Sequence, residues 1–214
     1  MSFAASVITN SVSTTLLDTA NYTWSLTELL EYLTEGLQAT AALKPNSYIT
    51  EVPFTPVAGT NQTLPADGVL LIDIQRNTGG RIVTQVDKEL LDESTRFWPN
   101  STPSAIAQHF TYDPRNPLNF VLFPPSTGTG ASLDLVYAAV PPTVTTSGQL
   151  INLVAAYVPA LIDYVLSRAY AKNSKRQDLS KAQTYLGQWA QKMGGKATAE
   201  AAAGPQVDRE EGTQ

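Results

Sequence analysis

The hydrophobic pattern of this chain changes its period twice, and this change constrains the fold more than any single motif. Apolar residues recur at helical intervals up to about residue 44, alternate in short runs between residues 48 and 140, and return to helical intervals afterwards. Proline, glycine, asparagine and aspartate separate the runs in the middle part, as in turns between short strands. The sequence therefore predicts an α+β protein, with a β-rich segment inserted between two sets of helices that form a bundle.

Two helices are predicted in the first 44 residues. The first covers residues 3–18, where apolar side chains keep a helical spacing. The second begins at a capping box, in which the Ser25 hydroxyl accepts from an amide three residues later and Glu28 reaches back to the cap. It should end before Pro45, because the residue ahead of a proline disfavours the helical conformation. Gly36 costs this helix about 1 kcal/mol relative to alanine, so we expect it to mark the close approach of another backbone.

Two hairpins and one further strand are predicted in the middle segment. The first hairpin joins residues 69–74 to residues 81–86 across a glycine-containing turn at 77–80. The second joins residues 105–112 to residues 118–123 across the turn at 113–117, where two prolines fix φ and Asp113 can bond forward to the backbone. Residues 87–93 should form a helical turn. Residues 132–140 form the last strand, because their apolar side chains alternate with more polar ones.

Two helices and a tail are predicted after the β-rich segment. Pro159 suits the first turn of one helix, where its missing amide proton loses no hydrogen bond. The last helix starts near Lys175 and should stop at Gly194 and Gly195, because glycine commonly ends helices. The predicted parts are therefore N-terminal bundle helices (1–44), a β-rich insertion (45–145), C-terminal bundle helices (146–195) and an extended tail (196–214) that is poor in large apolar residues.

The net charge of −5 is distributed unevenly along the chain. No lysine or arginine precedes Lys44, whereas residues 168–196 are strongly basic. Either the first and last helices pack side by side in one bundle, or these charged faces meet between neighbouring subunits of a ring. A nucleic-acid footprint is a third interpretation, disfavoured by the acidic total and by the lack of interleaved aromatic residues. The candidate subunit-interface residues are Glu28, Glu31, Glu35, Lys172, Lys175 and Arg176.

Few residues are suited to catalysis, and we expect no enzymatic activity. Cysteine is absent, which excludes disulfides, thiolate metal sites and a cysteine nucleophile. The single histidine, His109, lies in an alternating strand pattern and is predicted to be structural. The acidic residues between 87 and 93 lack the spacing of a calcium loop and should form a solvated face. No stretch is long and apolar enough to span a membrane.

Three stretches of the chain carry motifs in a fixed order. The first holds a Gln-x-Leu-Pro element, the second an Asp-Pro-Arg-Asn-Pro turn, and the third the pattern Tyr-x-Pro-x-Leu-x-Asp-Tyr-x-Leu-x-Arg-Ala. We interpret the motif positions as architectural; they are Gln62, Leu64, Pro65, Arg76, Asn77, Asp113, Pro114, Pro117, Phe120, Tyr157, Pro159, Asp163, Tyr164 and Arg168. Together with the second predicted helix, this order resembles the head–tail adaptor (connector) proteins of tailed bacteriophages. The resemblance covers roughly residues 10–190.

The resemblance implies a structural protein of the virion, with no cofactor and no membrane. Such adaptors form a homododecameric ring beneath the portal, so the implied partners are the portal protein, a tail or nozzle protein and further copies of this chain. DNA would pass through the lumen without sequence-specific binding. The implied location is the head–tail junction, after synthesis in the bacterial host cytoplasm. Related adaptors engage the portal through their C-terminal ends, which makes Lys196, Pro205, Val207 and Arg209 candidate portal-docking residues.

Arg168 and Asp163 are charged residues on a helix whose other residues are mostly apolar. They point about 140° apart on an ideal helix, so we expect each to have a partner elsewhere. For Arg168 we predict loop carbonyls between Gln62 and Pro65, or the turn at Asp113, because a guanidinium commonly ties a helix to such groups.

A second interpretation comes from a different class of protein. The chain would then be a non-enzymatic binding module of the phage tail, such as a fibre or carbohydrate-binding component. Such a module should be a monomer or trimer with an aromatic cleft, whereas an adaptor should assemble on portal rings.

Overall fold

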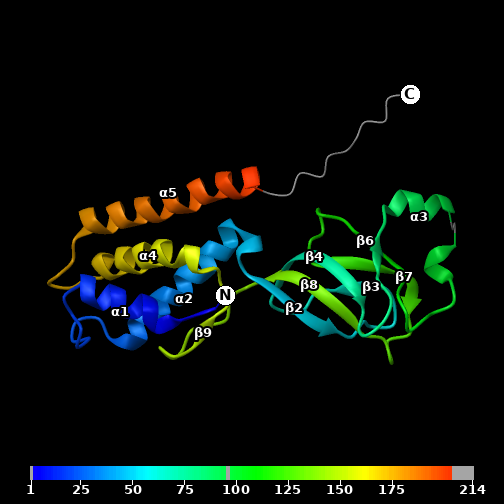
Figure 1. Ribbon diagram of the computed structural model, residues 1–214, viewed down its shortest axis with the longest axis horizontal. Helices are drawn as coiled ribbons and strands as arrows, with labels where there is room; N and C mark the ends of the chain where they lie inside the picture. Colours follow the sequence, from blue (N-terminus) through cyan, green and yellow to red (C-terminus); the bar gives the residue numbers. More distant parts are fainter. Residues whose placement is uncertain (1, 95–96, 204–214) are drawn as a thin grey trace, which may run out of the picture. The chain divides into compact units, whose positions relative to one another are not determined.

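The computed structural model describes residues 2–94 and 97–203, and its elements form an α+β fold, as predicted (Figure 1). The chain divides into two compact units. Residues 1–37 and 143–214 make up the first, called here the helical unit. Residues 38–142 make up the second, called here the β unit. A helical unit built from both ends of the chain agrees with the two changes of hydrophobic period.

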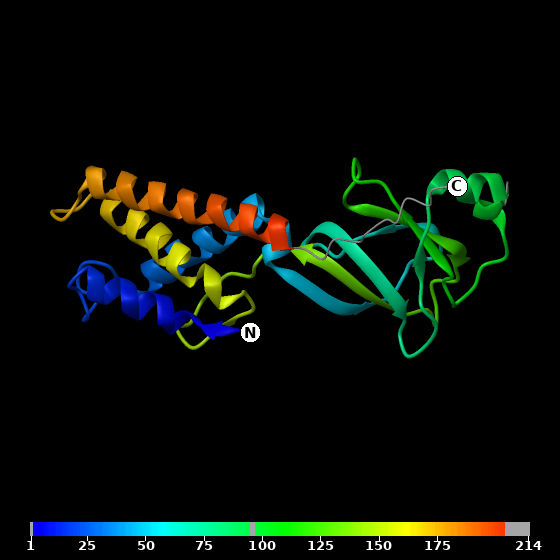
Figure 2. The same cartoon turned by 45° about the horizontal axis from the view of Figure 1, so that its top comes forward.

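Four helices dominate the helical unit: α1 (Ala5–Thr15), α2 (Leu26–Leu43, whose last turns belong to the β unit), α4 (Val158–Ala171) and α5 (Leu179–Ala203). Helix α4 packs against α1 and α5, and in Figures 1 and 2 these two lie on opposite sides of it. The short strands β1 (Phe3–Ala4) and β9 (Leu150–Ile151) pair antiparallel. A 3-10 turn, Ala155–Tyr157, leads into α4. Helix α4 thus contacts a helix from the beginning of the chain, α1, and one from its end, α5.

The apolar stripes predicted from the sequence form the core of the helical unit. Leu29 and Leu33 of α2 and Leu161 and Val165 of α4 are completely buried. Ile8 contributes the corresponding position of α1. Burial of a leucine or isoleucine side chain contributes about 1.5–3 kcal/mol each, so this cluster is the main source of stability for the unit.

Some predicted helix boundaries are confirmed and others are not; α2 ends at Leu43, before Pro45, as predicted. The capping box is confirmed, because the Glu28 amide donates to the Ser25 hydroxyl at 3.3 Å. Pro159 lies in the first turn of α4, as predicted. Helix α5 begins later than predicted, where the Asp178 carboxylate caps the Lys181 amide at 3.0 Å.

The predicted stop at Gly194 and Gly195 is wrong. Helix α5 continues through both glycines to Ala203, so residues 196–203 are helical and not extended. The alanine-rich sequence after the glycines has the highest helix propensity, which offsets about 1 kcal/mol lost at each glycine. The rest of the predicted tail lies outside the described residues.

Two sheets build the β unit. The first sheet has the order β2-β8-β4, with β2 (Ile49–Phe54), β4 (Gly68–Asn77) and β8 (Leu133–Ala139). The second has the order β3-β7-β6-β5, with β3 (Gly59–Thr63), β5 (Thr84–Gln85), β6 (His109–Tyr112) and β7 (Asn119–Ser126). Strands β5 and β6 pair in parallel, and the other named strand pairs of the described residues are antiparallel. The remaining elements are α3 (Lys88–Ser94) and the 3-10 turns Pro45–Ser47 and Trp98–Asn100.

The second predicted hairpin is confirmed, and the first is confirmed at its turn and for the residues next to it. Strands β6 and β7 pair antiparallel across the turn at 113–117. At the first turn, the Asn77 amide donates to the Arg81 carbonyl at 2.8 Å, and Gly79 adopts a φ of +70°. Beyond this turn, however, β4 pairs along its length with β8, and the second arm shrinks to the two residues of β5. Pairing with β8 uses one edge of β4; at the other edge the returning arm keeps an antiparallel bridge between Arg76 and Ile82 and a bond from the Val83 amide to the Gln75 carbonyl at 3.3 Å.

Both sheets contribute to one apolar core in the β unit. Leu133 and Leu135 of β8, with Ile74 of β4, are completely buried. Phe110 of β6 and Phe120 of β7 belong to the same cluster. The alternating patterns predicted from residues 132–140 are confirmed, because every second side chain of β8 enters this core.

The connection between α1 and α2, residues 16–24, is a tightly bonded loop that we call the Leu17 loop. The buried Asp18 carboxylate accepts hydrogen bonds from the amides of Tyr22, Thr23 and Trp24, at 2.8–3.0 Å. The Trp24 amide contributes most to holding the pKa of Asp18 below its usual range; burial opposes this effect. The indole of Trp24 donates to the Ala169 carbonyl at 3.0 Å and anchors the loop to α4.

Gly36 marks a close approach, but of a side chain and not of a backbone. A Cβ atom at this position would lie 2.9 Å from Cδ1 and 3.3 Å from Cγ of Tyr164. The Tyr164 ring is held in turn against Trp189, with ring centroids 5.2 Å apart and planes at 65°. The ring therefore has little room to retreat from an added methyl group.

Gly36→Ala should destabilise the protein by about 1–3 kcal/mol, because the overpacking against Tyr164 outweighs the better helix propensity of alanine. Gly187→Ala is the matched control, since this glycine lies on α5 with no atom within 4 Å of the added Cβ. It should stabilise the protein by about 1 kcal/mol. Urea unfolding measures both changes. Equal stabilisation by the two substitutions would contradict the packing assigned to Gly36.

Candidate functional site

The signature residues of α4 fasten this helix to its neighbours. Asp163 is buried and forms an ion pair with Lys192 of α5. Tyr164 packs between Gly36 of α2 and Trp189 of α5. The helix thus contacts two partners through adjacent positions of the motif. The prediction that Asp163 has a partner outside its own helix is confirmed.

The partner predicted for Arg168 is wrong, although a partner outside its helix exists. Its guanidinium pairs with the Glu35 carboxylate of α2, with Nε and Oε2 2.8 Å apart, instead of with loop carbonyls near Gln62 or the Asp113 turn. The guanidinium carbon also lies 5.8 Å from the ring centroid of Tyr32. The Arg168 side chain is 47% exposed, so it lies at the rim of the bundle and not in its interior.

A second ion pair joins the same two helices and their flanking residues. Lys172, which follows α4, pairs with Glu28 at 2.6 Å and donates to the Thr23 carbonyl at 3.0 Å. The Tyr32 hydroxyl donates to the same Glu28 carboxylate at 2.7 Å. Partial burial acts to raise the pKa of Glu28, but the hydrogen bonds from Lys172 and Tyr32 outweigh it and hold the pKa below its usual value.

These two ion pairs show what the uneven charge of the chain does within one subunit. Acidic residues of α2 meet basic residues of α4 and the position after it within one bundle, although the first and last helices, α1 and α5, lie on opposite sides of α4. Arg176 contacts the Leu17 loop, donating to the Leu16 carbonyl at 3.3 Å. Glu31 and Lys175 are exposed. Their role at a subunit interface stays a prediction.

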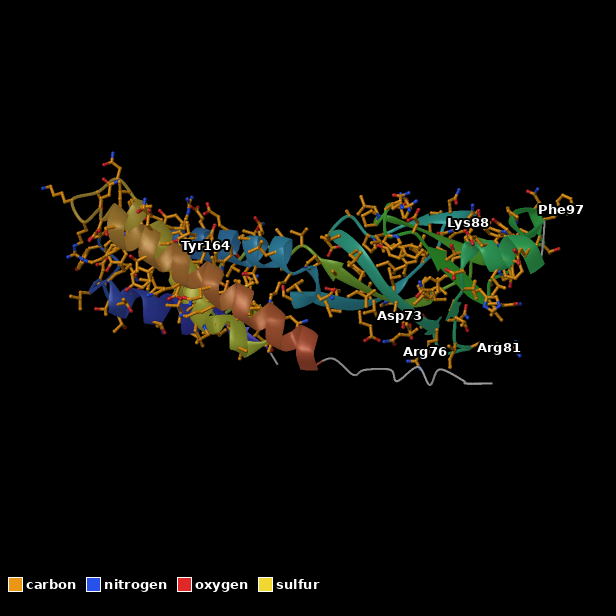
Figure 3. All side chains as sticks on the ribbon, turned by 90° about the horizontal axis from the view of Figure 1, so that it is seen from above. Asp73, Arg76, Arg81, Lys88, Phe97 and Tyr164 are labelled. Atoms are coloured by element: carbon orange, nitrogen blue, oxygen red, sulfur yellow. The ribbon has the colours of Figure 1, made fainter. Side chains whose placement is uncertain are left out.

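A groove of about 350 Å³ runs between α4 and α5. Figure 3 labels Tyr164, which lines it from α4. The α5 side carries two exposed leucines, Leu179 and Leu186, which are 58% and 45% exposed. On the same helix Ala182 and Met193 are buried, whereas the two leucines remain at the surface.

The Gln-x-Leu-Pro element shapes a loop of the β unit. Gln62 is buried, and its side chain accepts from the Val57 amide at 2.7 Å and donates to the Val57 carbonyl at 2.9 Å. Leu64 belongs to the core of the unit, and the Pro65 carbonyl accepts from the Gly68 amide at 2.8 Å. The Gln62 side chain thus bonds to both backbone groups of Val57, as a neighbouring strand would do in a sheet.

Asn77 joins the first hairpin to a distant segment of the same unit. It is buried; its Nδ2 donates to the Arg81 and Ala107 carbonyls at 3.0 and 2.8 Å, and its Oδ1 accepts from the Ala107 amide at 2.9 Å. The neighbouring Arg76, labelled with Arg81 in Figure 3, pairs with Asp134 of β8 at 2.7 Å. All side-chain polar groups of Asn77 thus serve backbone positions that lack regular strand partners.

The turn at 113–117 has the local bonding expected from its sequence. The Asp113 carboxylate accepts from the Arg115 amide at 2.9 Å, and the Asp113 carbonyl accepts from the Asn116 amide at 2.9 Å. Pro117 offers its carbonyl to the Tyr112 hydroxyl at 3.2 Å. Pro114 occupies the turn itself, and Phe120 follows it into the core, 1% exposed.

The candidate portal-docking residues fall at the edge of the described chain. Lys196 lies in the last part of α5. Pro205, Val207 and Arg209 lie outside the described residues. Their contact with a portal stays a prediction.

Asp87, Glu89 and Asp113 line one surface hollow in the described part of the chain, together with Lys88 and Arg115. No group of three or more histidine, cysteine, aspartate or glutamate residues within it could hold a metal ion. His109 is part of β6, and its ring stacks on Phe123 of β7 with centroids 6.1 Å apart. No helix of the described ranges is long and apolar enough to cross the bilayer.

Several residues that hold the helical unit together were missed by the sequence analysis. Trp24 and Asp18 anchor the Leu17 loop, and Lys192 neutralises Asp163. The bonds of Asp18 are local, to amides four to six residues later, whereas the Ala169 partner of Trp24 lies in a distant helix that the local sequence does not indicate. An aspartate ahead of a tryptophan and a capping box was the only local indication.

Comparison with known proteins identifies the class of protein to which this arrangement belongs. A family model described as SU10 adaptor protein matches residues 3–209. The chain therefore belongs to the SU10 adaptor protein family, and the resemblance to phage adaptors is confirmed. It is a phage adaptor, a structural protein of the virion in a family of structural rather than catalytic proteins. No curated protein matches the sequence.

Asn77→Ala should destabilise the protein by about 1–3 kcal/mol, because it leaves the buried Ala107 amide and carbonyl without partners. Asn61→Ala is the matched control in the same unit, at an exposed position of β3, and should change stability by less than about 0.5 kcal/mol. Thermal and urea unfolding report both. A loss no greater than that of the control would show that Asn77 does not support this connection.

The Glu28–Lys172 pair should be coupled more strongly than the Glu35–Arg168 pair, because its side chains are 20% and 31% exposed against 44% and 47%. Double-mutant cycles with alanine should give about 0.5–1 kcal/mol for the first pair and less for the second. Raising the salt concentration to about 1 M should reduce the coupling of the more exposed pair more strongly. Equal coupling energies and equal salt sensitivity would refute this ranking.

Proposed function

We propose that this phage adaptor is a head–tail adaptor, which forms a homododecameric ring that joins the portal to the tail and lets DNA pass. The observation that carries the proposal is the match of the SU10 adaptor protein family to residues 3–209. Its partners would be the portal protein, a tail or nozzle protein and further copies of itself. Its place would be the head–tail junction, and it would be made in the host cytoplasm.

The physical character of the described residues supports a structural role. Buried polar side chains such as Gln62 and Asn77 bond to backbone groups, and most of the motif residues brace loops or join helices. Such residues give a rigid part of defined shape, which is what a joint between two larger assemblies needs. The family match also favours an adaptor over a separate fibre or carbohydrate-binding module.

The contacts that the charged helix residues make within one subunit are compatible with a ring. Four of the predicted interface residues already contact groups of their own subunit, namely Glu28, Glu35, Lys172 and Arg176. The subunit contact would therefore rely less on these charges than on other surfaces. Exposed Glu31 and Lys175 could add to it, and each exposed pair would contribute at most about 1 kcal/mol.

The C-terminal segment is proposed to dock on the portal. Removal of residues 204–214 leaves α5 complete, because this helix extends to Ala203. A variant ending at Ala203 should keep its melting temperature and its helical circular dichroism but fail to co-sediment with cognate portal rings. A polar segment that orders on its partner can cover a distant surface, which is the physical reason for this expectation.

Two further variants make the docking experiment specific. Replacing Pro205, Val207 and Arg209 by serine should reduce portal binding as the truncation does. Replacing Glu210 and Glu211 by serine, a matched change in the same segment, should reduce it much less. Unchanged co-sedimentation of the truncated protein would exclude the segment as the docking site. Failure of the intact protein to bind portal rings would exclude the adaptor function itself.

A further inference from the structure

Helix α4 packs through two faces of different character. Toward α2, Cδ2 of Leu161 lies 3.5 Å from where a Cβ atom on Gly36 would be, and Leu161 and Val165 are completely buried. Toward α5, the residues of α4 are small, polar or aromatic; they are Asp163, Tyr164, Ser167, Tyr170 and Ala171. The contact between α4 and α2 thus rests on aliphatic burial, whereas the contact between α4 and α5 rests on aromatic and polar pairs.

Little of α5 is buried, although it packs along α4. Its side chains are described for residues 179–194, and of these Ala182 and Met193 are buried while Tyr185 and Trp189 are half-buried. The other positions of this stretch are exposed, and a groove of about 350 Å³ separates part of α5 from α4. Most helical stability in proteins comes from burying one face of the helix. Helix α5 is therefore held more weakly than α4, of which half the residues are buried.

Docking of α5 also places polar groups in the interior. The indole Nε1 of Trp189 is buried and has no hydrogen-bond acceptor among the described residues. The buried Asp163 carboxylate depends on Lys192 of α5 for its ion pair. A buried N–H group without an acceptor is costly, and it regains a hydrogen bond in water. Part of the gain from packing α5 is thus offset.

The sequence of α5 also makes it a weak helix on its own. Glycine lowers helix propensity more than any residue except proline. Three glycines lie inside α5, namely Gly187, Gly194 and Gly195. A helix of this composition is marginal in water without a packing partner. Its backbone amides would therefore exchange with solvent once α5 leaves α4.

We propose that α5 is a separable arm of the helical unit, which detaches from α4 as one piece while α1, α2 and α4 stay packed. Helices α1 and α5 lie on opposite sides of α4 (Figures 1 and 2), so detachment leaves the contact of α1 with α4 in place. The bond from Trp24 to the Ala169 carbonyl is likewise retained. Detachment would give residues 204–214, which follow α5, a longer reach. It would serve the proposed portal docking but does not depend on it.

Amide hydrogen exchange of the intact protein tests this directly, because it measures the opening of each segment. Relative to an unfolded peptide, the amides of residues 182–193 should exchange at least about tenfold faster than those of residues 161–169. Low concentrations of urea should accelerate exchange less in α5 than in α4, since detachment exposes less surface than global unfolding. Equal protection of the two helices at every urea concentration would overturn the proposal.

Two substitutions separate detachment from global unfolding. Ile8→Val removes one buried carbon from α1, which packs on α4. It weakens the docked and detached states equally, so exchange should accelerate about two- to tenfold in α4 and stay unchanged in α5. Lys192→Met removes the partner of the buried Asp163 and weakens only the docked state. Both helices should then exchange faster, by about tenfold or more.

Gln188→Met is the matched control for Lys192→Met, because Gln188 is an exposed position of the same helix. It should change neither exchange rate by more than about twofold. Acceleration of α4 and α5 by the same factor in Ile8→Val would show that α5 opens only together with the whole unit, which would overturn the proposal. All these measurements use the free protein. Their failure would leave the adaptor function, which portal co-sedimentation tests, unaffected.

Discussion

The helical unit depends on the burial of α4 among the other helices. Leu161, Val165 and Ala169 are fully buried, and the same helix bonds to Trp24 through its Ala169 carbonyl. Because α1 and α2 precede the β unit in the chain and α4 and α5 follow it, this packing brings together segments more than a hundred residues apart. The β-rich segment can therefore be long and independently packed without disturbing the bundle.

Charge has a different part in this protein from hydrophobic burial. The acidic residues of α2 and the basic residues at the end of α4 form ion pairs within one subunit, and their partial exposure limits each to a small contribution. They orient α2 relative to α4 rather than hold the two together. These charges are thus largely used within the subunit, whereas Leu179 and Leu186 of α5 keep apolar surface exposed.

The β unit illustrates how the shape of a structural protein is maintained. Its irregular loops are braced by buried amide side chains, since Gln62 and Asn77 each satisfy backbone groups that no strand can reach. A carboxylate would be costly there, because it could accept but not donate. Gln62 and Asn77 are thus motif residues whose side chains both donate and accept hydrogen bonds, as irregular backbone requires. This requirement explains why an amide residue stands at each of the two positions.

The sequence by itself determined the features that depend on neighbouring residues. Three such features are found in the structure, namely the Ser25 capping box, Pro159 in a first turn and the Asp113 turn. The change of hydrophobic period likewise agrees with the order of helices and strands. Only the tertiary structure decided the partners of charged and exposed groups: Arg168 binds Glu35, β4 pairs with β8, and Leu186 stays at the surface. These outcomes depend on which distant segments compete for the same place, and a local pattern carries no information about that competition.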